Sequence, residues 1–373
     1  MSAPYDSRLI LDVLPVPLAQ SAFEQVRDEV EWSDMQHHGG AVPRLVCIQG
    51  DVEADGVQPI YRHPADEQPA LHDWTPAVRQ IRDVVSARIG QPLNHALIQM
   101  YRGGGDFISE HADKTIDVAR GSAIVNVSLG AMRTMVLRPK PRDGGRKIEG
   151  ARQSTRCPLP HASLFVLGWE TNRRMTHEIR ADKRRAEERS AEERSHGGAR
   201  ISITFRHVAT FLTADGKVFG QGARNKRRAD AAAVVCDDPA EEEALLRAFS
   251  AENKNADFEW EESLYGRGCD AVNFLALNSR HAPPGAAQTA SASGGAELTT
   301  SRALAALAAQ IGRRVLTCAT AGSKVPGRGR RVLCACAMAV ALGVIAVSYG
   351  AATRGPGTRA ARAALQSEGR SSG

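Results

Sequence analysis

The sequence predicts a mainly β protein with flanking helices, in the α+β class, whose core is a jelly roll or a related sandwich. Two observations predict this fold. Apolar residues recur at helical spacing from Ala77 to Ile89, and Gly90 and Pro92 then end the pattern. After this helix come several short apolar or alternating segments separated by turn residues: 95–101, 122–129, 133–138, 163–167 and 200–208. A leading helix followed by many short strands is typical of jelly rolls backed by helices.

Length and composition are those of an ordinary globular protein. The chain has 373 residues, of which 42% are hydrophobic and 24% charged, and these values exclude collagen-like and wholly disordered chains. Lys and Arg outnumber Asp and Glu by 48 to 42, so the net charge is +6. This excess is compatible with a polyanionic partner, but simple solubility explains it equally well.

The cysteines and the first residues predict the compartment. Seven scattered cysteines without a Cys-x-x-Cys pair argue against a disulfide framework and against a zinc ribbon. The first residues include Asp6 and Asp12 and lack the basic and apolar regions of a secretory signal. We therefore expect an intracellular protein, nuclear or cytoplasmic. The sequence gives no indication of the oligomeric state.

The first two segments of the chain are an extension and a core. Residues 1–71 are expected to form an N-terminal extension that packs on the core, with a helix at 22–30 and a strand at 44–49. Residues 72–215 contain the leading helix and the predicted strands, and they form the core.

The last two segments differ in composition. Residues 216–277 are expected to form a helical extension, with a basic cluster at 224–228 and a helix at 239–249. Residues 278–373 are rich in Ala, Gly, Ser and Arg, which is typical of a disordered low-complexity tail. Within this tail, 332–349 is an uncharged apolar run that just reaches membrane-spanning length. Its many Ala and Gly residues and its basic flanks make a membrane anchor the less favoured interpretation.

A His-x-Asp pair, His111 and Asp113, follows a Gly-rich turn and is expected just before a strand. On extended backbone, residues two apart point to the same side, so both side chains could reach one metal ion. His177, ten residues after the apolar segment 163–167, would supply a third ligand. Two histidines and one carboxylate suit non-haem Fe(II) that also binds a co-substrate and O₂. The chain has eleven histidines, so each could instead be an ordinary polar residue.

The last predicted strand carries two arginines on one face. Alternation separates its apolar residues from a polar face that consists of Arg200, Ser202, Thr204 and Arg206. If that face lies inside a barrel, both guanidinium groups need anions. A dicarboxylate supplies both anions, and a guanidinium matches a carboxylate in bidentate geometry. The alternative is an exposed face with two solvated arginines.

Taken in chain order, these features resemble the AlkB family of Fe(II)- and 2-oxoglutarate-dependent dioxygenases. The resemblance covers residues 43–212 and rests on the His-x-Asp pair, on the second histidine and on the closing arginine strand. Three further stretches agree with it: Gln99-Met100-Tyr101, Ser128-Leu129-Gly130-Ala131 and Pro160-His161-x-Ser163-Leu164. The family implies a double-stranded β-helix (jelly-roll) core, Fe(II) as the metal, and 2-oxoglutarate and O₂ as co-substrates.

The resemblance also implies roles for individual residues. It makes three residues the iron ligands: His111, Asp113 and His177. It places Arg200 on the far carboxylate of 2-oxoglutarate, assisted by Tyr101, and Arg206 near the carboxylate that chelates iron. Gln99 and Ser202 stand where the family often has Asn, and both keep hydrogen-bonding capacity.

The activity implied by the resemblance is oxidative dealkylation. 2-Oxoglutarate is converted to succinate and CO₂, an alkyl group on a base nitrogen is hydroxylated, and the product releases an aldehyde. The protein contributes orientation and excludes side reactions. We therefore expect the chain to act on N-alkylated bases in nucleic acid, as in AlkB-like repair or demethylation.

The residues that would contact the substrate are less clearly indicated. Thr115 stands where repair relatives commonly have an acidic residue for the flipped base, although its hydroxyl could still bind a base edge. Arg44 and Tyr61 resemble part of the family's substrate-recognition lid, where an aromatic stacks on the base, but Tyr61 could equally be core packing. The loop 139–156 carries basic residues that would track phosphates or lie solvated: Lys140, Arg142, Arg146, Lys147, Arg152 and Arg156.

Two other functions are open. The first is the same oxygenase chemistry on a protein or small-molecule substrate, which would show little salt dependence. The second is a catalytically silent scaffold, tethered to a membrane through 332–349. The presence of all three predicted ligands and both arginines argues against the scaffold.

Overall fold

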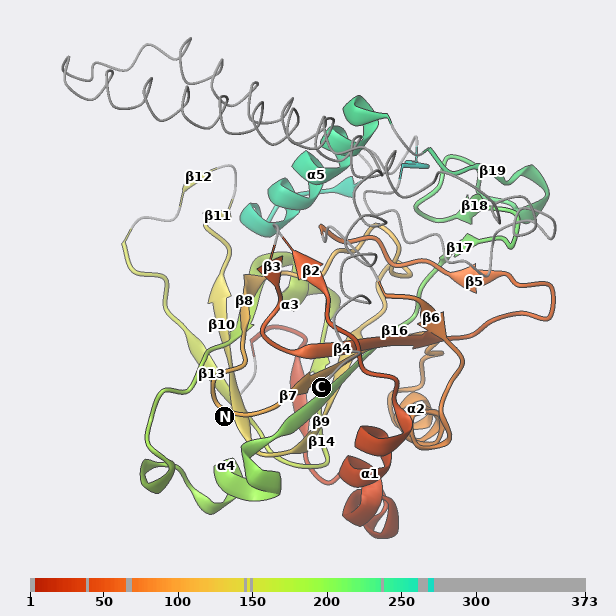
Figure 1. The fold of residues 1–373 in the computed structure, drawn as a ribbon. Helices are drawn as coiled ribbons and strands as arrows, with labels where there is room; N and C mark the ends of the chain where they lie inside the picture. The colour runs from red at the N-terminus through yellow and green to blue at the C-terminus, as the bar shows by residue number, and fades with distance from the viewer. Residues whose placement is uncertain are drawn as a thin grey trace, which may run out of the picture. The chain divides into compact units, whose positions relative to one another are not determined.

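A seven-stranded and a four-stranded sheet form the centre of the part of the chain that the structure describes (Figure 1). In this computed structural model the described residues are 4–37, 40–64, 69–143, 146–147, 150–235, 238–260 and 268–271. All of them lie in the first of the chain's two units, Met1–Ala287. The predicted tail with its apolar run 332–349 lies outside them. None of the described helices is both long and apolar enough to cross a membrane.

The larger sheet has the strand order β1-β14-β9-β16-β7-β4-β6. Its neighbours are antiparallel, except that β4 and β6 run parallel. The strands are β1 (Arg8–Ile10), β4 (Leu45–Gly50), β6 (Leu71–His72), β7 (His95–Tyr101), β9 (Ile124–Gly130), β14 (Ser163–Leu167) and β16 (Arg200–Arg206). Strands β1, β4 and β6 come from the first 72 residues, so this part of the chain contributes directly to the main sheet.

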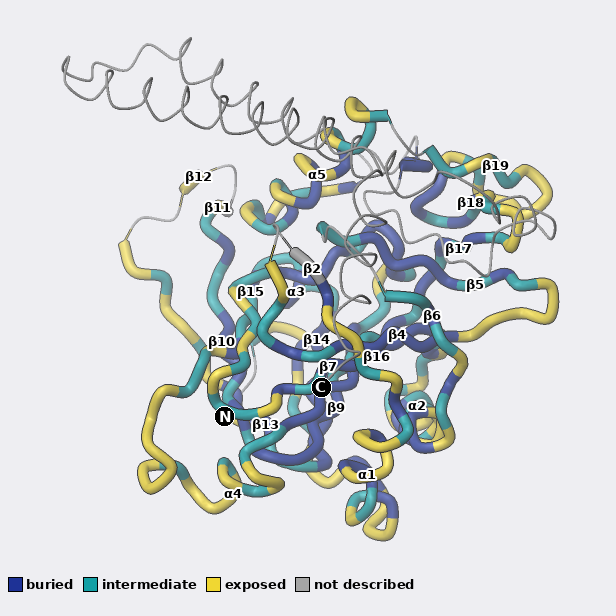
Figure 2. The backbone as a smooth tube through the Cα atoms, in the orientation of Figure 1, coloured by how far each residue is buried: buried dark blue, intermediate teal, exposed yellow. Residues whose placement is uncertain are grey.

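The smaller sheet is antiparallel throughout, in the order β13-β10-β15-β8. Its strands are β8 (Ile108–His111), β10 (Arg133–Pro139), β13 (Thr155–Leu159) and β15 (Met175–Ile179). The two sheets enclose a buried apolar cluster, in which Phe165 and Leu167 of the larger sheet pack with Leu137 and Leu159 of the smaller one. Figure 2 shows this buried centre in dark blue.

Two helices cover the other face of the larger sheet: α1 (Val16–Glu29) and α2 (Pro76–Ile89). Phe23 of α1 and Ile81 of α2 belong to one buried cluster with Ile203 and Phe205 of β16. Helix α2 begins with a proline, whose missing N–H costs nothing there, and ends at Gly90, which has the left-handed φ of 68°. This geometry confirms the predicted helix and its end.

Smaller elements surround this centre. A third sheet, β19-β18-β17-β5, is made of Gln58–Pro59 (β5), Thr210–Leu212 (β17), Lys217–Gly220 (β18) and Ala232–Ala233 (β19). Two short hairpins are β2–β3 (Gln36–His37, Gly40–Ala41) and β11–β12 (Arg142–Asp143, Arg146–Lys147). The helices are α3 (Trp169–Arg174), α4 (Ala191–Arg194) and α5 (Pro239–Lys254), with short 3₁₀ turns at Ala186–Glu188, Ser195–Gly198 and Arg228–Asp230.

The predicted mainly β architecture is confirmed. Strands β7 and β14 match the predicted segments 95–101 and 163–167 to the residue, and α5 extends the predicted helix 239–249 by five residues. Sequence reasoning missed β13, α3, β15 and the third sheet. It also placed the His-x-Asp pair before a strand, whereas His111 is the last residue of β8.

Candidate active site

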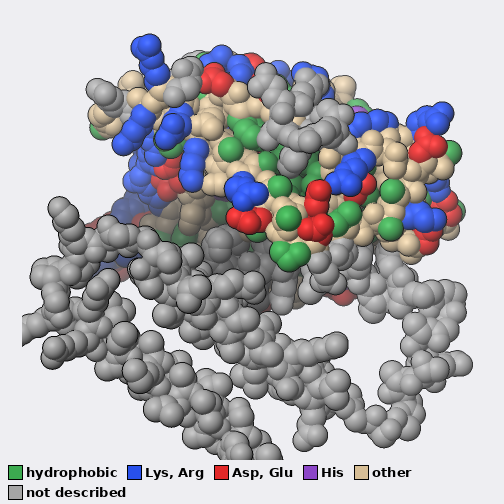
Figure 3. Space-filling model, turned by 90° about the horizontal axis from the view of Figure 1, so that it is seen from above, with side chains coloured by type: hydrophobic (Ala, Val, Ile, Leu, Met, Phe, Trp, Pro, Cys, Tyr) green, Lys and Arg blue, Asp and Glu red, His purple; other side chains and the backbone are tan. Residues whose placement is uncertain are grey.

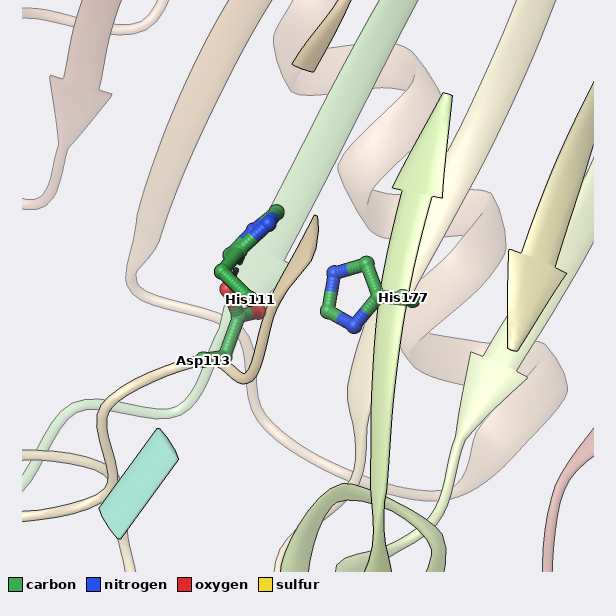
Figure 4. A group of neighbouring side chains, drawn as sticks. All are labelled: His111, Asp113 and His177. Atoms are coloured by element: carbon green, nitrogen blue, oxygen red, sulfur yellow. Dashed lines mark ion pairs between the residues drawn. The ribbon is translucent and has the colours of Figure 1, made fainter. Parts of the chain in front are cut away.

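The three predicted metal ligands lie together between the ends of β8 and β15 (Figure 4). His111 ends β8, Asp113 follows two residues later, and His177 lies on β15 directly opposite His111 in the strand register. One potential ligand atom from each of the three side chains lies within 4.8 Å of the other two. The imidazole ring centroids are 4.4 Å apart. The pairing of β8 with β15 is therefore what brings together residues 66 positions apart in the sequence.

Burial and charge set the protonation of this cluster. Burial raises the pKa of Asp113, but Arg206 and the two histidines lower it more, to about 2. Burial and the neighbouring His177 lower the pKa of His111 to about 3. Burial also lowers the pKa of His177. At neutral pH the cluster therefore presents two neutral imidazoles and a carboxylate, which are the forms that bind metal.

A small cavity of about 60 Å³ between the two sheets adjoins the cluster, and Arg200 lies in its wall. The Arg200 side chain is 1% exposed. Its Nη2 donates to Ser128 Oγ at 2.8 Å and to Asn126 Oδ1 at 3.2 Å, while its Nε and Nη1 have no hydrogen-bond partner among the described residues. Burial lowers the pKa of Arg200 to about 10. Since buried unpaired donors are costly, these two N–H groups fit an incoming carboxylate.

The other predicted 2-oxoglutarate residues lie around the same cavity. Tyr101 lies under Arg200, whose guanidinium carbon is 5.2 Å from the ring centroid. The Nε2 of Gln99 is buried without a described partner, and Ser202 Oγ accepts from Asn126 Nδ2 at 2.6 Å. Asn126 also donates to Thr204 Oγ1. The predicted alternation of β16 is confirmed, because Arg200, Ser202, Thr204 and Arg206 all line this cavity.

Sequence reasoning missed Asn126 and Ser128, which hold Arg200 and Ser202. Both lie two residues apart on β9, so they share a face in an otherwise apolar strand. That spacing was the available signal, since a polar pair with period two inside an apolar strand indicates a polar cavity rather than solvent.

A larger cavity, of about 510 Å³, lies on the other side of the cluster. His111, Asp113, Gln99 and Arg206 line both cavities. Arg44 lies in the larger cavity's wall, is 6% exposed and donates from Nη1 to Phe107 O at 3.0 Å. The arrangement can therefore hold a metal with one small ligand on one side and a larger molecule on the other.

Tyr61 also lines the larger cavity, but it is a packed side chain. It is 5% exposed, its ring lies 4.0 Å from the guanidinium carbon of Arg206, and its hydroxyl accepts from the backbone N–H of Lys114. Burial raises the pKa of Tyr61 above its usual range. Tyr61 is therefore packed in the interior and also forms part of the wall of the larger cavity.

Thr115, which the sequence suggests as a substrate contact, is hydrogen-bonded to Glu252 of α5 in the structure. Its hydroxyl donates to Glu252 Oε1 at 2.7 Å, and its backbone N–H donates to the same oxygen at 3.0 Å. It lines a separate cavity of about 40 Å³ with Lys140 and Trp260, and it is not among the residues that line the larger cavity. The hydroxyl therefore already has a hydrogen-bond partner on α5.

The basic loop 139–156 differs from the expected row of unpaired charges. Lys140 is 2% exposed, and burial lowers its pKa to about 8. Arg152 donates to Glu110 Oε1 at 2.7 Å, so it is paired. Arg146 and Lys147 are exposed on the β11–β12 hairpin. On the face in Figure 3 basic side chains are prominent, but acidic side chains lie among them.

Comparison with known proteins agrees with this geometry. A family model described as the 2OG-Fe(II) oxygenase superfamily matches residues 6–206, which is more than half of the chain. The chain belongs to this superfamily. A 2OG-Fe(II) oxygenase uses Fe(II), 2-oxoglutarate and O₂, and the donor set fits them: two imidazoles and a carboxylate for the metal, and unpaired guanidinium donors for the 2-oxo acid.

Among 2OG-Fe(II) oxygenases the chain is AlkB-like. It is 35% identical over 136 residues to DNA oxidative demethylase ALKBH2 of Homo sapiens, which is 36% of this chain and 47% of that protein. ALKBH2 of Bos taurus is 33% identical over 154 residues, 39% of this chain and 50% of the relative. Alpha-ketoglutarate-dependent dioxygenase alkB homolog 3 of Bos taurus is 26% identical over 167 residues, which is 43% of this chain and 55% of that protein. The chain thus spans about half the length of the relatives it matches.

Proposed function

We propose that this 2OG-Fe(II) oxygenase oxidatively dealkylates N-alkylated bases in nucleic acid. One observation carries the proposal: a two-histidine, one-carboxylate cluster lies between a small cavity, where Nε and Nη1 of the buried Arg200 have no described partner, and a cavity of about 510 Å³. A cavity of this size can enclose one extruded base. The names of the relatives, which include DNA oxidative demethylases, support the substrate class.

The finer fold assignment belongs to the same proposal. The larger and the smaller sheets pack face to face around one apolar cluster and are built from short strands that, except for the β4–β6 pair, are antiparallel. We assign them as the two layers of a double-stranded β-helix, the jelly-roll core of this superfamily. The metal cluster would then lie where the layers open, with ligands from strands of the smaller layer.

The residues have separable roles in this mechanism. His111, Asp113 and His177 would hold Fe(II), which together with 2-oxoglutarate and O₂ supplies the oxidation of an alkyl C–H. Arg200 would hold the distal carboxylate through its free Nε and Nη1, and Ser128 fixes the guanidinium from the other side. Arg206 holds one oxygen of Asp113 and keeps that carboxylate ionised.

The remaining site residues would shape the pocket and the co-substrate site. Tyr101 covers one face of Arg200, and Gln99 and Ser202 offer polar atoms to the small cavity. Arg44 and Tyr61 form walls of the larger cavity and would enclose the base. Excluding water from the small cavity strengthens each charged contact there.

Succinate release tests the proposal. The full-length protein is given Fe(II), 2-oxoglutarate and O₂, with methylated or unmethylated single-stranded DNA or RNA. We expect succinate and formaldehyde to rise together with the methylated oligonucleotide and to fall steeply with added salt. Succinate that no oligonucleotide stimulates would reject the substrate class and favour a protein or small molecule. No succinate under any condition would favour the silent scaffold.

The compartment stays a prediction. The proposed substrate agrees with an intracellular protein, nuclear or cytoplasmic, and the basic cluster 224–228 is the segment that would serve as a nuclear address. In the structure Arg224 pairs with Glu241, and Arg228 pairs with Glu53 and Asp55, so this cluster is largely neutralised.

A further inference from the structure

Four consecutive backbone N–H groups, those of residues 112–115, donate hydrogen bonds to side chains of other parts of the chain. The backbone N–H of Ala112 donates to Asn253 Oδ1 at 2.9 Å. The next three N–H groups, of Asp113, Lys114 and Thr115, donate to Asn172, Tyr61 and Glu252 at 3.0 Å each. Side-chain acceptors therefore replace the strand ladder from the point where β8 ends.

Two of these four acceptors, Asn253 and Glu252, lie on α5. This helix follows the family match, which ends at residue 206, and it is more than 130 positions away from the loop in the sequence. Glu252 is 4% exposed, and its Oε1 also accepts from Trp260 Nε1 at 3.0 Å, so the end of α5 is itself anchored. Phe249 and Trp260 pack with Ile116, just beyond the loop, in one buried cluster.

Asn253 occupies the central position in this arrangement. Ala112 is the single residue between two of the proposed ligands, His111 and Asp113, so its peptide sets their relative orientation. Asn253 Oδ1 accepts from Ala112 N and from Lys114 Nζ, and Lys114 Nζ in turn donates to Ala112 O at 3.0 Å. The backbone N–H of Ala112 thus binds Asn253, its C=O binds Lys114, and these two side chains also bind each other. Asn253 also lines the larger cavity.

We propose that Asn253 is a positioning residue for the metal site, and that α5 is therefore a working part of the active site although it lies outside the family match. The inference rests on the proposed ligand set. Without the Asn253 acceptor, Ala112 N–H and Lys114 Nζ both lose a partner in a buried loop. The peptide between the two ligands is then free to rotate, and the ligands lose their fixed geometry. Residues that orient ligands in this way typically contribute about 10–100-fold to metal affinity.

Co(II) binding to the metal-free full-length chain tests this role without turnover. Co(II) is titrated into the wild type, Asn253→Ala, Asn253→Asp and, as a matched control on the same helix turn, Lys254→Ala, whose side chain donates to Ser250 Oγ. We expect Asn253→Ala to bind Co(II) about 10-fold or more weakly, with a changed visible absorption spectrum. Asn253→Asp keeps an oxygen acceptor for both donors and should restore wild-type affinity and spectrum, as should Lys254→Ala.

Two outcomes would overturn the proposal. One is an Asn253→Ala variant with the affinity and spectrum of the wild type. The other, which does not depend on how well the alanine variant folds, is an Asn253→Asp variant that binds Co(II) as weakly as a ligand variant. The Co(II) titration contains no oligonucleotide and requires no turnover. If the wild type binds Co(II) but releases no succinate in the activity assay, the proposed function is rejected and the role of Asn253 stands.

Discussion

Arg206 Nη2 lies 3.2 Å from Asp113 Oδ2, and both side chains are buried. The other oxygen, Oδ1, lies 3.8 Å from His111 Nε2, on the side of the metal cluster. The guanidinium therefore occupies one carboxylate oxygen and leaves the other for the metal. It also keeps the pKa of Asp113 low against the effect of burial. One residue of β16 thus connects the larger sheet to the ligand set of the smaller sheet.

His177→Ala should abolish succinate release and leave the fold intact. His177 is half-buried on β15, so truncation opens the site without removing much core volume. Arg88→Gln, at an exposed position in the last turn of α2, is the control and should keep full activity. Activity would be compared under saturating Fe(II), and the fold by circular dichroism. Turnover at the wild-type rate in His177→Ala would refute its assignment as a ligand.

Arg200→Lys should raise the KM for 2-oxoglutarate while changing thermal stability little. Lysine keeps the charge but lacks the planar fork, so it cannot hold Ser128 and a carboxylate at once. Losing one arm of a buried charged contact costs about 2–5 kcal/mol, or roughly 30-fold or more in affinity. Initial rates across a range of 2-oxoglutarate concentrations measure this. An unchanged KM would show that the co-substrate binds elsewhere.

Asp117→Asn should destabilise the protein by about 3–5 kcal/mol, because it leaves a buried arginine without its counter-charge. Both Arg62 and Asp117 are 0% exposed, and Nη2 lies 2.7 Å from Oδ1. Arg62 also donates to the carbonyl groups of Ala271 and Gly222, so it holds the segment 268–271 and the turn after β18 together. Urea unfolding gives the free energy.

Asp215→Asn provides the matched control for that experiment. It removes an acidic partner from an ion pair with Lys217, in which both side chains are about half exposed. Solvent screening makes such exposed pairs contribute little to stability, so only a small loss of unfolding free energy is expected. If Asp117→Asn and Asp215→Asn lose the same amount of unfolding free energy, a structural role for the buried pair is contradicted.

Stability should rise with pH between about 8 and 10.5 because of Lys140. Burial lowers its pKa from 10.5 to about 8 in the folded chain. In this interval the unfolded chain still binds the proton and the folded chain has released it, so the free energy of unfolding increases with pH, by up to about 3 kcal/mol. Lys140→Met lacks the titrating group, and the comparison isolates its effect from other groups. Parallel pH dependence in both proteins would exclude Lys140 as the source.

Sequence reasoning located the strands that have an uninterrupted pattern and missed those that do not. Strands β7 and β14 are buried along most of their length, so their apolar runs are plain. Strand β15 was missed because Thr176, His177 and Glu178 break its apolar pattern, and the break is caused by the metal site itself. The residues that carry the proposed chemistry therefore removed the local signal of the strand that holds them.

The candidate site residues could be predicted from the sequence, but the residues that hold them in position could not. His111, Asp113, Arg200 and Arg206 stand in short motifs, which a single sequence displays. Asn253 stands in an ordinary amphipathic helix, and nothing in its neighbourhood indicates that it meets Ala112. The partner of Thr115, Glu252, could not be predicted for the same reason, since it is 137 positions away. Contacts of such separation are decided by tertiary packing.

The two sheets hold different halves of the proposed chemistry: His111 and His177 belong to the smaller one, and Arg200 to the larger. A co-substrate that contacts both the metal and Arg200 would therefore bridge the layers as a non-covalent cross-link. Metal alone would contact residues of the smaller sheet, and co-substrate alone would contact mainly the larger sheet. Joint loading should thus stabilise the whole fold by more than the two separate effects combined, making the protein's resistance to proteolysis a direct indicator of correct assembly.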